Sequence, residues 1–338
     1  MTQQTETLLE VKGLKTHFFL DEGTVRAVDG VDFSVKRGQT LGIVGESGCG
    51  KSVTAFSILQ LVSPPGEIVE GEILVHLKDG DNPMGEIDVA AMDPYGDDLR
   101  AVRGKEIAMI FQEPMTSLSM MHRVGFQIME AIQLHFDITA EEARERAIEM
   151  LRRVGIPKPE QRVDDYPFQL SGGMRQRVMI AMALSCNPSL LIADEPTTAL
   201  DVTTQAQILE LIQELQREFG MAVMIITHDL GVVAEICDDV VVMYLGEVVE
   251  RADVDSIFHD PKHPYTQALL SSIPRLGQSK QGRLSPIEGS VPDPYNRPEG
   301  CPFHPRCSQM IPGKCDVKHP ILLDLPDGRA VRCLLYED

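Results

Sequence analysis

The sequence has 338 residues, of which 43% are hydrophobic, so it can form a sizeable core and more than one domain. Its 51 acidic and 31 basic residues give a formal charge of −20, which argues against nucleic acid as the main ligand, because nucleic acids are bound by clustered Lys and Arg. No run reaches the roughly 18 apolar residues of a membrane span, and no signal-peptide pattern is visible at the N-terminus. We therefore expect a cytosolic protein, in which cysteines are thiols or metal ligands more often than disulfides.

The first part of the chain shows a strand pattern followed by a helix pattern. Apolar and polar residues alternate in 8–20 and 25–35, which predicts two strands of a hairpin. Residues 40–45 predict a short buried strand that runs directly into a glycine-rich loop. The mostly apolar segment 52–62 predicts a helix that is stopped by Pro64.

The middle of the chain alternates strands with helices. Residues 78–98 contain seven acidic side chains among turn residues and are interpreted as a solvated surface insertion. Thr139 and Glu142 form a predicted capping box at the start of a helix that reaches Val154. Further short apolar strands are predicted at 189–194, 221–227 and 239–246, with a helix at 203–219 between the first two. This alternation predicts an α/β domain with a mainly parallel sheet.

A phosphate-binding loop follows the predicted strand at 40–45. Gly45, Gly50, Lys51 and Ser52 fit the pattern G-x-x-x-x-G-K-[ST] between a strand and a helix. Backbone N–H groups of such a loop surround a β-phosphate, the lysine reaches the β- and γ-phosphates, and the serine hydroxyl ligates Mg²⁺. We expect a nucleoside triphosphate to be held by Gly45, Glu46, Ser47, Gly48, Cys49, Gly50, Lys51, Ser52 and Val53.

Two carboxylates end another buried strand about 140 residues later. Asp194 is placed to hold the magnesium shell, and Glu195 could accept a proton from the attacking water. A pair of carboxylates on a surface loop is the alternative. A phosphate loop elsewhere in the same chain favours the magnesium site, because both loops should emerge at the same strand ends.

The segment LSGGMRQRV at 170–178 resembles the signature motif of ATP-binding-cassette (ABC) ATPases. Other family motifs occur in order: Gln112 matches the Q-loop, Asp201 the D-loop and His228 the switch histidine. Phe18 fits the position of the aromatic that stacks on adenine. The resemblance implies a P-loop ABC-type fold with an N-terminal antiparallel β subdomain, and it implies an active ATPase with ATP and Mg²⁺ as ligands.

The resemblance also assigns roles to residues. Gln112, Glu195 and His228 would be catalytic, and Mg²⁺ would be held by Ser52, Gln112 and Asp194. Ser171, Gly172 and Gly173 would face the nucleotide of a partner subunit, since the N–H groups at a helix start form an anion site. Hydrolysis would then need two such chains.

The C-terminal part narrows the family further. Residues 260–274 and 288–307 resemble the C-terminal extension of the dipeptide/oligopeptide importer ATPases, which include nickel importers. The resemblance implies the ATPase subunit of a peptide importer. Its partners would be two membrane permeases, an extracytoplasmic solute-binding protein and a similar but distinct second ATPase. A homodimer is the alternative for the ATPase pair, and no nucleic acid is expected.

The resemblance places the protein peripherally on the cytoplasmic face of the inner (plasma) membrane. Residues 119–125 depart from the family pattern and leave uptake of oligosaccharide or nickel as alternatives. A non-transport ABC ATPase acting on a macromolecular complex is the rival class. We expect domains at 1–260 and 261–338, with a helical subdomain at about 113–180.

Four late cysteines form a candidate metal site. Cys301, Cys307, Cys315 and Cys333 lie within 33 residues that are rich in Pro and Gly, and their spacing matches no familiar zinc or ferredoxin motif. Metal–thiolate bonds could supply folding energy that such a segment lacks. Zinc, an iron–sulfur cluster, unligated thiols and a disulfide pair are open on spacing alone, and the family resemblance favours a 4Fe–4S cluster.

Overall fold

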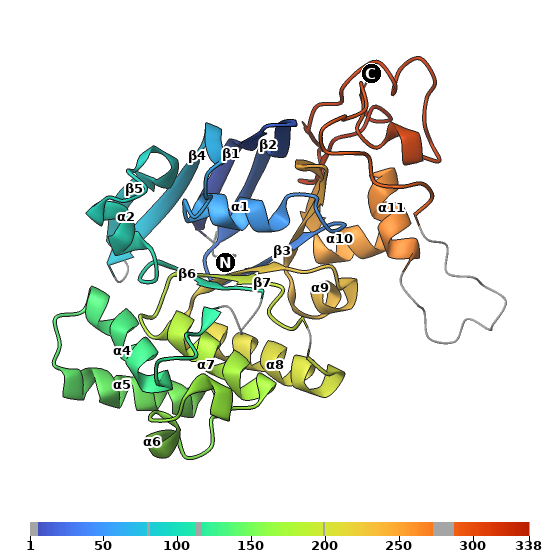
Figure 1. Cartoon of the computed structure of the whole chain (residues 1–338). Coiled ribbons are helices and arrows are strands. Elements are labelled where there is room, and N and C mark those ends of the chain that lie inside the picture. Colours follow the sequence, from blue (N-terminus) through green and yellow to red (C-terminus); the bar gives the residue numbers. More distant parts are fainter. Residues whose placement is uncertain (1–5, 80–81, 113–116, 199, 273–286, 338) are drawn as a thin grey trace. The chain divides into compact units, whose positions relative to one another are not determined.

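Figure 1 shows a computed structural model of the chain, which describes residues 6–79, 82–112, 117–198, 200–272 and 287–337. These residues form two compact units. The first contains the described residues up to Leu8 together with Val35–Gln39 and Met92–Ile226, and the second contains Leu9–Ser34, Thr40–Ala91 and the described residues from Thr227 onward.

An antiparallel sheet lies almost entirely in the second unit. Its strands are β1 (Thr7–Leu20), β2 (Gly23–Lys36), β4 (Gly66–Asp79) and β5 (Asn82–Asp88), in the order β2-β1-β4-β5. The hairpin predicted at the N-terminus is therefore confirmed. In β2 the buried side chains of Val31, Phe33 and Val35 alternate with less buried neighbours, which places one face of this strand against the core.

The acidic segment lies at the surface, as predicted, with Glu86, Asp93, Asp97 and Asp98 exposed, but part of it forms regular secondary structure. Residues 82–88 form β5, which pairs antiparallel with β4, and α2 (Asp97–Val102) follows. Asp88 shows why an acidic residue fits here: its Oδ1 accepts hydrogen bonds from the N–H groups of Ile73 and Ala90, each at 3.0 Å. The sequence pattern missed this strand because its acidic residues satisfy backbone donors or face solvent.

The second unit also contains part of the predicted parallel sheet. β3 (Thr40–Val44) is buried along its length and pairs parallel with β9 (Asp239–Tyr244), which pairs antiparallel with β10 (Glu247–Asp253). β12 (Ala330–Val331) pairs with β10, and β11 (Leu323–Asp324) pairs with β12. The last part of the chain thus extends the same sheet. The helices of this unit are α1 (Lys51–Ile58), α9 (Leu230–Ile236), α10 (Val254–His259) and α11 (Pro264–Ser271).

Helix α1 is shorter than the predicted 52–62. It ends because Gln60 adopts a left-handed conformation with φ of 48°, and the N–H of Leu61 donates to the carbonyl of Phe56 at 2.7 Å. This is the closing hydrogen bond of a Schellman-type helix end. The local cap, and not Pro64, stops the helix.

The first unit joins three parallel strands to a group of helices. β6 (Ile107–Ile110), β7 (Leu190–Asp194) and β8 (Ala222–Ile226) are fully buried and pair in that order. Three helices pack together, α4 (Val124–His135), α5 (Ala140–Arg153) and α7 (Gly172–Leu184), as Figure 1 shows. The unit also contains α6 (Pro159–Arg162) and α8 (Val202–Phe219).

The predicted capping box of α5 is confirmed. The Glu142 N–H donates to Thr139 Oγ1 at 3.2 Å, and the Thr139 N–H donates to Glu142 Oε2 at 2.8 Å. Short 3₁₀ turns occur at η1 (Val89–Ala91), η2 (Pro167–Gln169) and η3 (His304–Arg306). Among the helices in the described parts of the chain, none is long and apolar enough to cross a membrane.

Candidate nucleotide-binding site

The glycine-rich loop connects β3 to α1 in the second unit, as the sequence predicts. Gly45 and Gly50 have φ values of 155° and 102°, and a Cβ atom at either would lie 2.3 Å or less from a backbone oxygen, that of Met243 or that of Ala27. Gly48 also has a positive φ, 80°, but open space around it. The loop therefore needs glycine for close backbone contact at two positions and for backbone conformation at a third.

Lys51 holds the loop through backbone carbonyls. Its side chain is buried, and Nζ donates to Gly45 O at 2.8 Å and to Glu46 O at 3.1 Å. Cys49 packs inside the loop, where burial raises the pKa of its thiol. Gly45, Cys49, Gly50 and Lys51 are buried, Glu46, Ser52 and Val53 are half-buried, and Ser47 and Gly48 are exposed. A loop whose tip residues are exposed and whose C-terminal end carries a lysine can bind a phosphate group.

Two other predicted residues lie in the second unit. His228 is exposed, one residue before Asp229, whose Oδ1 accepts from the N–H of Gly231 at 2.9 Å and caps α9. Phe18 is half-buried, and its ring carbons lie 2.6 and 2.9 Å from the point where a Cβ on Gly66 would be. Phe19, which the sequence analysis did not select, is the more exposed aromatic side chain at this end of β1, with 49% of its surface accessible.

The first unit brings the Q-loop glutamine to the glutamate after β7. Gln112 Nε2 donates to Glu195 Oε2 at 2.8 Å, and Thr198 Oγ1 donates to the same oxygen at 2.9 Å. Glu195 has a φ of 46°, a conformation that a non-glycine residue adopts rarely, and its N–H is held by Ile226 O at 2.8 Å. Asp194, at the end of β7, is 2% exposed. The turn after β7 thus aims the Glu195 carboxylate while Asp194 stays in the sheet.

The signature and the D-loop each begin a helix in the first unit. Ser171 caps α7, its Oγ accepting from the Met174 N–H at 3.3 Å, and Gly172 and Gly173 form the first turn. Asp201 caps α8, accepting from the N–H and the hydroxyl of Thr204 at 3.0 and 2.7 Å, and these hydrogen bonds lower its pKa. Ser171 and Asp201 are exposed, so both helix starts face solvent within the described chain.

Comparisons with known proteins decide the family. A family model described as "ABC transporter" matches residues 28–198, and one described as "Oligopeptide/dipeptide transporter, C-terminal region" matches residues 249–315. The oligopeptide transport ATP-binding protein AppD of Bacillus subtilis (strain 168) is 51% identical over 333 residues, which cover 98% of each chain. The chain belongs to the ABC transporter family.

Further relatives agree with this assignment. The dipeptide transport ATP-binding protein DppD of Escherichia coli (strain K12) is 49% identical over 326 residues, or 96% of each chain. Among solved structures, the dimeric bacterial ABC transporter cassette MJ0796 matches 73% of this chain and 99% of its own, with 29% identity and a TM-score of 0.62. The ABC cassette is a P-loop ATPase fold, and this chain is accordingly an ABC ATPase that uses ATP with Mg²⁺.

The four late cysteines of this ABC protein converge. Cys301, Cys307, Cys315 and Cys333 line one pocket beside Phe303, although up to 32 positions separate them in the sequence. The free space in the pocket is about 10 Å³. In the described parts of the chain, no three His, Cys, Asp or Glu side chains are arranged to hold a metal ion as they stand. Burial raises the pKa of Cys301 to about 12 and that of Cys333 to about 11.

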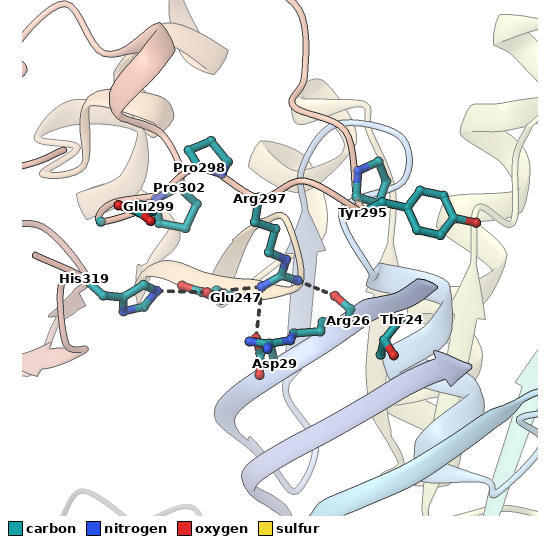
Figure 2. A pocket seen from close by; sticks show the side chains of 12 residues that line it. Thr24, Arg26, Asp29, Glu247, Tyr295, Arg297, Pro298, Glu299, Pro302 and His319 are labelled. Atoms are coloured by element: carbon teal, nitrogen blue, oxygen red, sulfur yellow. Dashed lines mark hydrogen bonds and ion pairs between the residues drawn. The ribbon is translucent and has the colours of Figure 1, made fainter. Parts of the chain in front are cut away.

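A larger pocket of about 420 Å³ is lined by residues that do not belong to the phosphate loop (Figure 2). Arg297 points into it and donates to Asp29 Oδ2 at 3.0 Å and to Glu247 Oε1 at 3.4 Å, while His319 Nε2 lies 3.1 Å from the same Glu247 oxygen. Burial lowers the pKa of Arg297, and the two carboxylates oppose that shift. The ion pairs of Arg297 with Asp29 and Glu247 therefore join the C-terminal part of the chain to β2 and β10.

A contact that sequence reasoning missed lies at the phosphate loop itself. Arg306 forms a bidentate ion pair with Glu46, with Nη1–Oε2 and Nη2–Oε1 distances of 2.6 and 3.0 Å. The two residues are 260 positions apart, and neither belongs to a motif that specifies the other. The only signal in the sequence was that an arginine directly precedes one of the clustered cysteines.

Proposed function

We propose that this ABC ATPase powers the uptake of di- and oligopeptides. The observation that carries the proposal is the similarity over 98% of the chain to a protein named for oligopeptide transport, including the C-terminal region matched at 249–315. A match to the ATPase domain alone would not distinguish peptide transport from other ABC functions.

The residues of the second unit have nucleotide-binding roles in this proposal. Gly45–Val53 hold the phosphates, Lys51 binds the β- and γ-phosphates and Ser52 ligates Mg²⁺. His228 acts as the switch histidine and Phe18 as the adenine platform. The glycine conformations of the loop and the inward position of Lys51 support the phosphate role, because a glycine-rich turn with a lysine at its base is the arrangement that binds phosphate.

The residues of the first unit have catalytic and partner-facing roles in this proposal. Glu195 accepts the proton of the attacking water, and Asp194 and Gln112 hold Mg²⁺. The hydrogen bonds from Gln112 and Thr198 to Glu195 Oε2 support this role, because they fix the orientation of the carboxylate. Ser171–Gly173 and Asp201 serve the nucleotide bound by a second ATPase subunit, in keeping with their position at solvent-facing helix starts.

The working complex contains two ATPase subunits, two membrane permeases and an extracytoplasmic solute-binding protein. The second ATPase is a similar but distinct chain, and the pair lies on the cytoplasmic face of the membrane. Two observations support the assembly: the relatives are named as ATP-binding proteins of transport systems, and the similar solved cassette is dimeric. ATP binding closes the ATPase pair and hydrolysis reopens it.

The C-terminal extension, residues 261–338 beyond the ATPase domain 1–260, carries a 4Fe–4S cluster in this proposal. Four cysteines lining one pocket form a thiolate donor set suited to such a cluster. A single zinc ion held by four thiolates is the alternative. Because the free space is only about 10 Å³, binding also requires the surrounding loops to move apart. The cluster would supply cross-linking bonds to a segment with little core.

Transport assays test the function directly. Cells lacking the gene should lose uptake of labelled di- and oligopeptides, and the wild-type gene, but not one encoding Lys51→Ala, should restore it. Uptake of labelled nickel or an oligosaccharide, with peptide uptake unchanged by the deletion, would reassign the substrate. Purification of the tagged protein from membranes should recover two multi-span proteins, whereas recovery of ribosomes or DNA would indicate a non-transport ATPase.

A further inference from the structure

Every polar group of Glu46, the second residue of the phosphate loop, has a partner. Its carboxylate accepts both Arg306 hydrogen bonds, and its N–H donates to the hydroxyl of Tyr265 at 2.9 Å. Its carbonyl accepts from Lys51 Nζ at 3.1 Å. Two of the three side-chain partners, Arg306 and Tyr265, come from the C-terminal part of the chain.

Arg306 is built into its position. Its side chain is 3% exposed, and its guanidinium carbon lies 5.9 Å from the centre of the Tyr244 ring. Nε donates to the carbonyl of Glu288 at 3.2 Å. The Glu46 carboxylate raises the pKa of Arg306, which keeps the guanidinium charged. A bidentate pair of this kind fixes direction as well as distance.

The turn that contains Arg306 is held in place by the cysteine segment and by aromatic side chains. Arg306 ends η3, which joins Cys301 to Cys307, and the N–H of Cys301 donates to Cys315 O at 2.8 Å. Phe303 lies edge-on to the rings of Tyr244 and Tyr265, with both centroid distances 5.3 Å. The aromatic cluster and the cysteine pocket therefore limit the movement of the guanidinium.

Lys51 is the one partner of Glu46 that phosphate would draw away. The ammonium that donates to Gly45 O and Glu46 O is the same group that the P-loop pattern assigns to the phosphates. A lysine that turns to a phosphate gives up its hold on these carbonyls. Arg306 and Tyr265 then become the remaining side-chain contacts that keep Glu46 in place.

We propose that Arg306 is a positioning residue for nucleotide binding: it holds the phosphate loop in its binding shape through Glu46, so the C-terminal extension sets the affinity for Mg-ATP. The inference rests on the proposed nucleotide site and adds to it a contribution from outside the ATPase motifs. Without the ion pair, the loop would also adopt conformations that do not bind nucleotide. The apparent affinity for Mg-ATP would then fall in proportion to the fraction of molecules whose loop is in the binding conformation.

The test compares two arginines of the extension in the full-length protein. Arg306→Gln removes the contact with Glu46, and Arg329→Gln removes an arginine of similar burial that pairs with Asp260 and Asp327. Mg-ATP dissociation constants are measured by calorimetry, and hydrogen exchange is followed in peptides covering 46–50. Arg306→Lys keeps the charge without the two-pronged geometry. Lys51→Ala is the reference for loss of phosphate binding.

We expect Arg306→Gln to weaken Mg-ATP binding by about 3- to 10-fold and to speed exchange in the loop, with Arg306→Lys between it and wild type. Arg329→Gln should leave both quantities within about twofold of wild type even if it lowers the melting temperature. A folded Arg306→Gln protein with wild-type affinity and exchange would overturn the inference.

A folding failure of the variant and a failure of the proposed nucleotide site can each be distinguished from a failure of the inference. If Arg306→Gln does not fold, Glu46→Gln breaks the same pair from the loop side, and unchanged affinity in that variant equally overturns the inference. If wild type binds Mg-ATP no better than Lys51→Ala, the proposed nucleotide site itself fails, whatever the role of Arg306.

Discussion

Gln112 and Glu195 share a hydrogen bond of 2.8 Å between Nε2 and Oε2, although 83 positions separate them in the chain. The hydroxyl of Thr198 donates to the same carboxylate oxygen. The carboxylate is thus held from two sides on a backbone with a φ of 46°. A group held this firmly in a rarely populated conformation is a good candidate for a catalytic role.

Replacement of this carboxylate should separate binding from hydrolysis. Glu195→Gln keeps the size and one oxygen of the side chain but cannot accept a proton, so ATP should still bind while phosphate release falls by about 100-fold or more. Glu210→Gln, an exposed position on α8, is the matched control and should hydrolyse ATP normally. Near-normal turnover by Glu195→Gln in the assembled transporter would remove Glu195 from the role of general base.

Two glycines of the phosphate loop should differ sharply in their tolerance of alanine. A Cβ at Gly50 would lie 2.2 Å from Ala27 O, whereas one at Gly48 meets nothing within 4 Å. Both positions have positive φ, so Gly48→Ala should cost about 1 kcal/mol of unfolding free energy, and Gly50→Ala clearly more, because the backbone must also shift. Urea unfolding measures both. Equal losses in the two variants would show that close approach to Ala27 does not constrain the loop.

The clustered cysteines should bind a cofactor that stabilises the protein. Protein purified without oxygen should contain about four iron atoms per chain and absorb broadly near 400 nm, and Cys307→Ser should lose iron and melt several degrees lower. The Cys186→Ser variant, which replaces a buried cysteine outside the pocket, should retain the same iron content as wild type. A colourless protein that holds one zinc ion would replace the cluster with a zinc site.

The ion pair between His319 and Glu247 should make stability depend modestly on pH. The hydrogen bond to Glu247 raises the pKa of His319, and Arg332 opposes this shift. A raised pKa in the folded state stabilises the protein below the unfolded pKa of about 6.5, and the contribution is lost as pH rises through the folded value.

Because 49% of the His319 side chain is exposed, screening limits this contribution to about 0.5 kcal/mol. Wild type should therefore exceed His319→Asn in unfolding free energy at pH 5.5 and match it at pH 8.5, by urea unfolding at both values. A constant difference at the two pH values would show that the effect comes from packing.

Local signals predicted much of this protein. The phosphate loop, the hairpin of β1 and β2, the buried β3 and β7, and the cap of α5 at Thr139 depend on residues within a few positions of one another, where pattern and backbone preference act directly. The end of α1 also depended on local structure, but on a left-handed Gln60 that no residue preference indicates.

The tertiary structure decided what distant residues do together. Acidic 82–88 forms a strand because β4 offers it a partner, four scattered cysteines line one pocket, and Arg306 pairs with Glu46 across 260 positions. Such contacts form only when folding brings distant segments of the chain close together. A buried charge then pairs with an opposite charge that the fold places nearby. Motifs in the sequence therefore specified the phosphate-binding chemistry, and the fold alone determined which residues hold the loop that performs it.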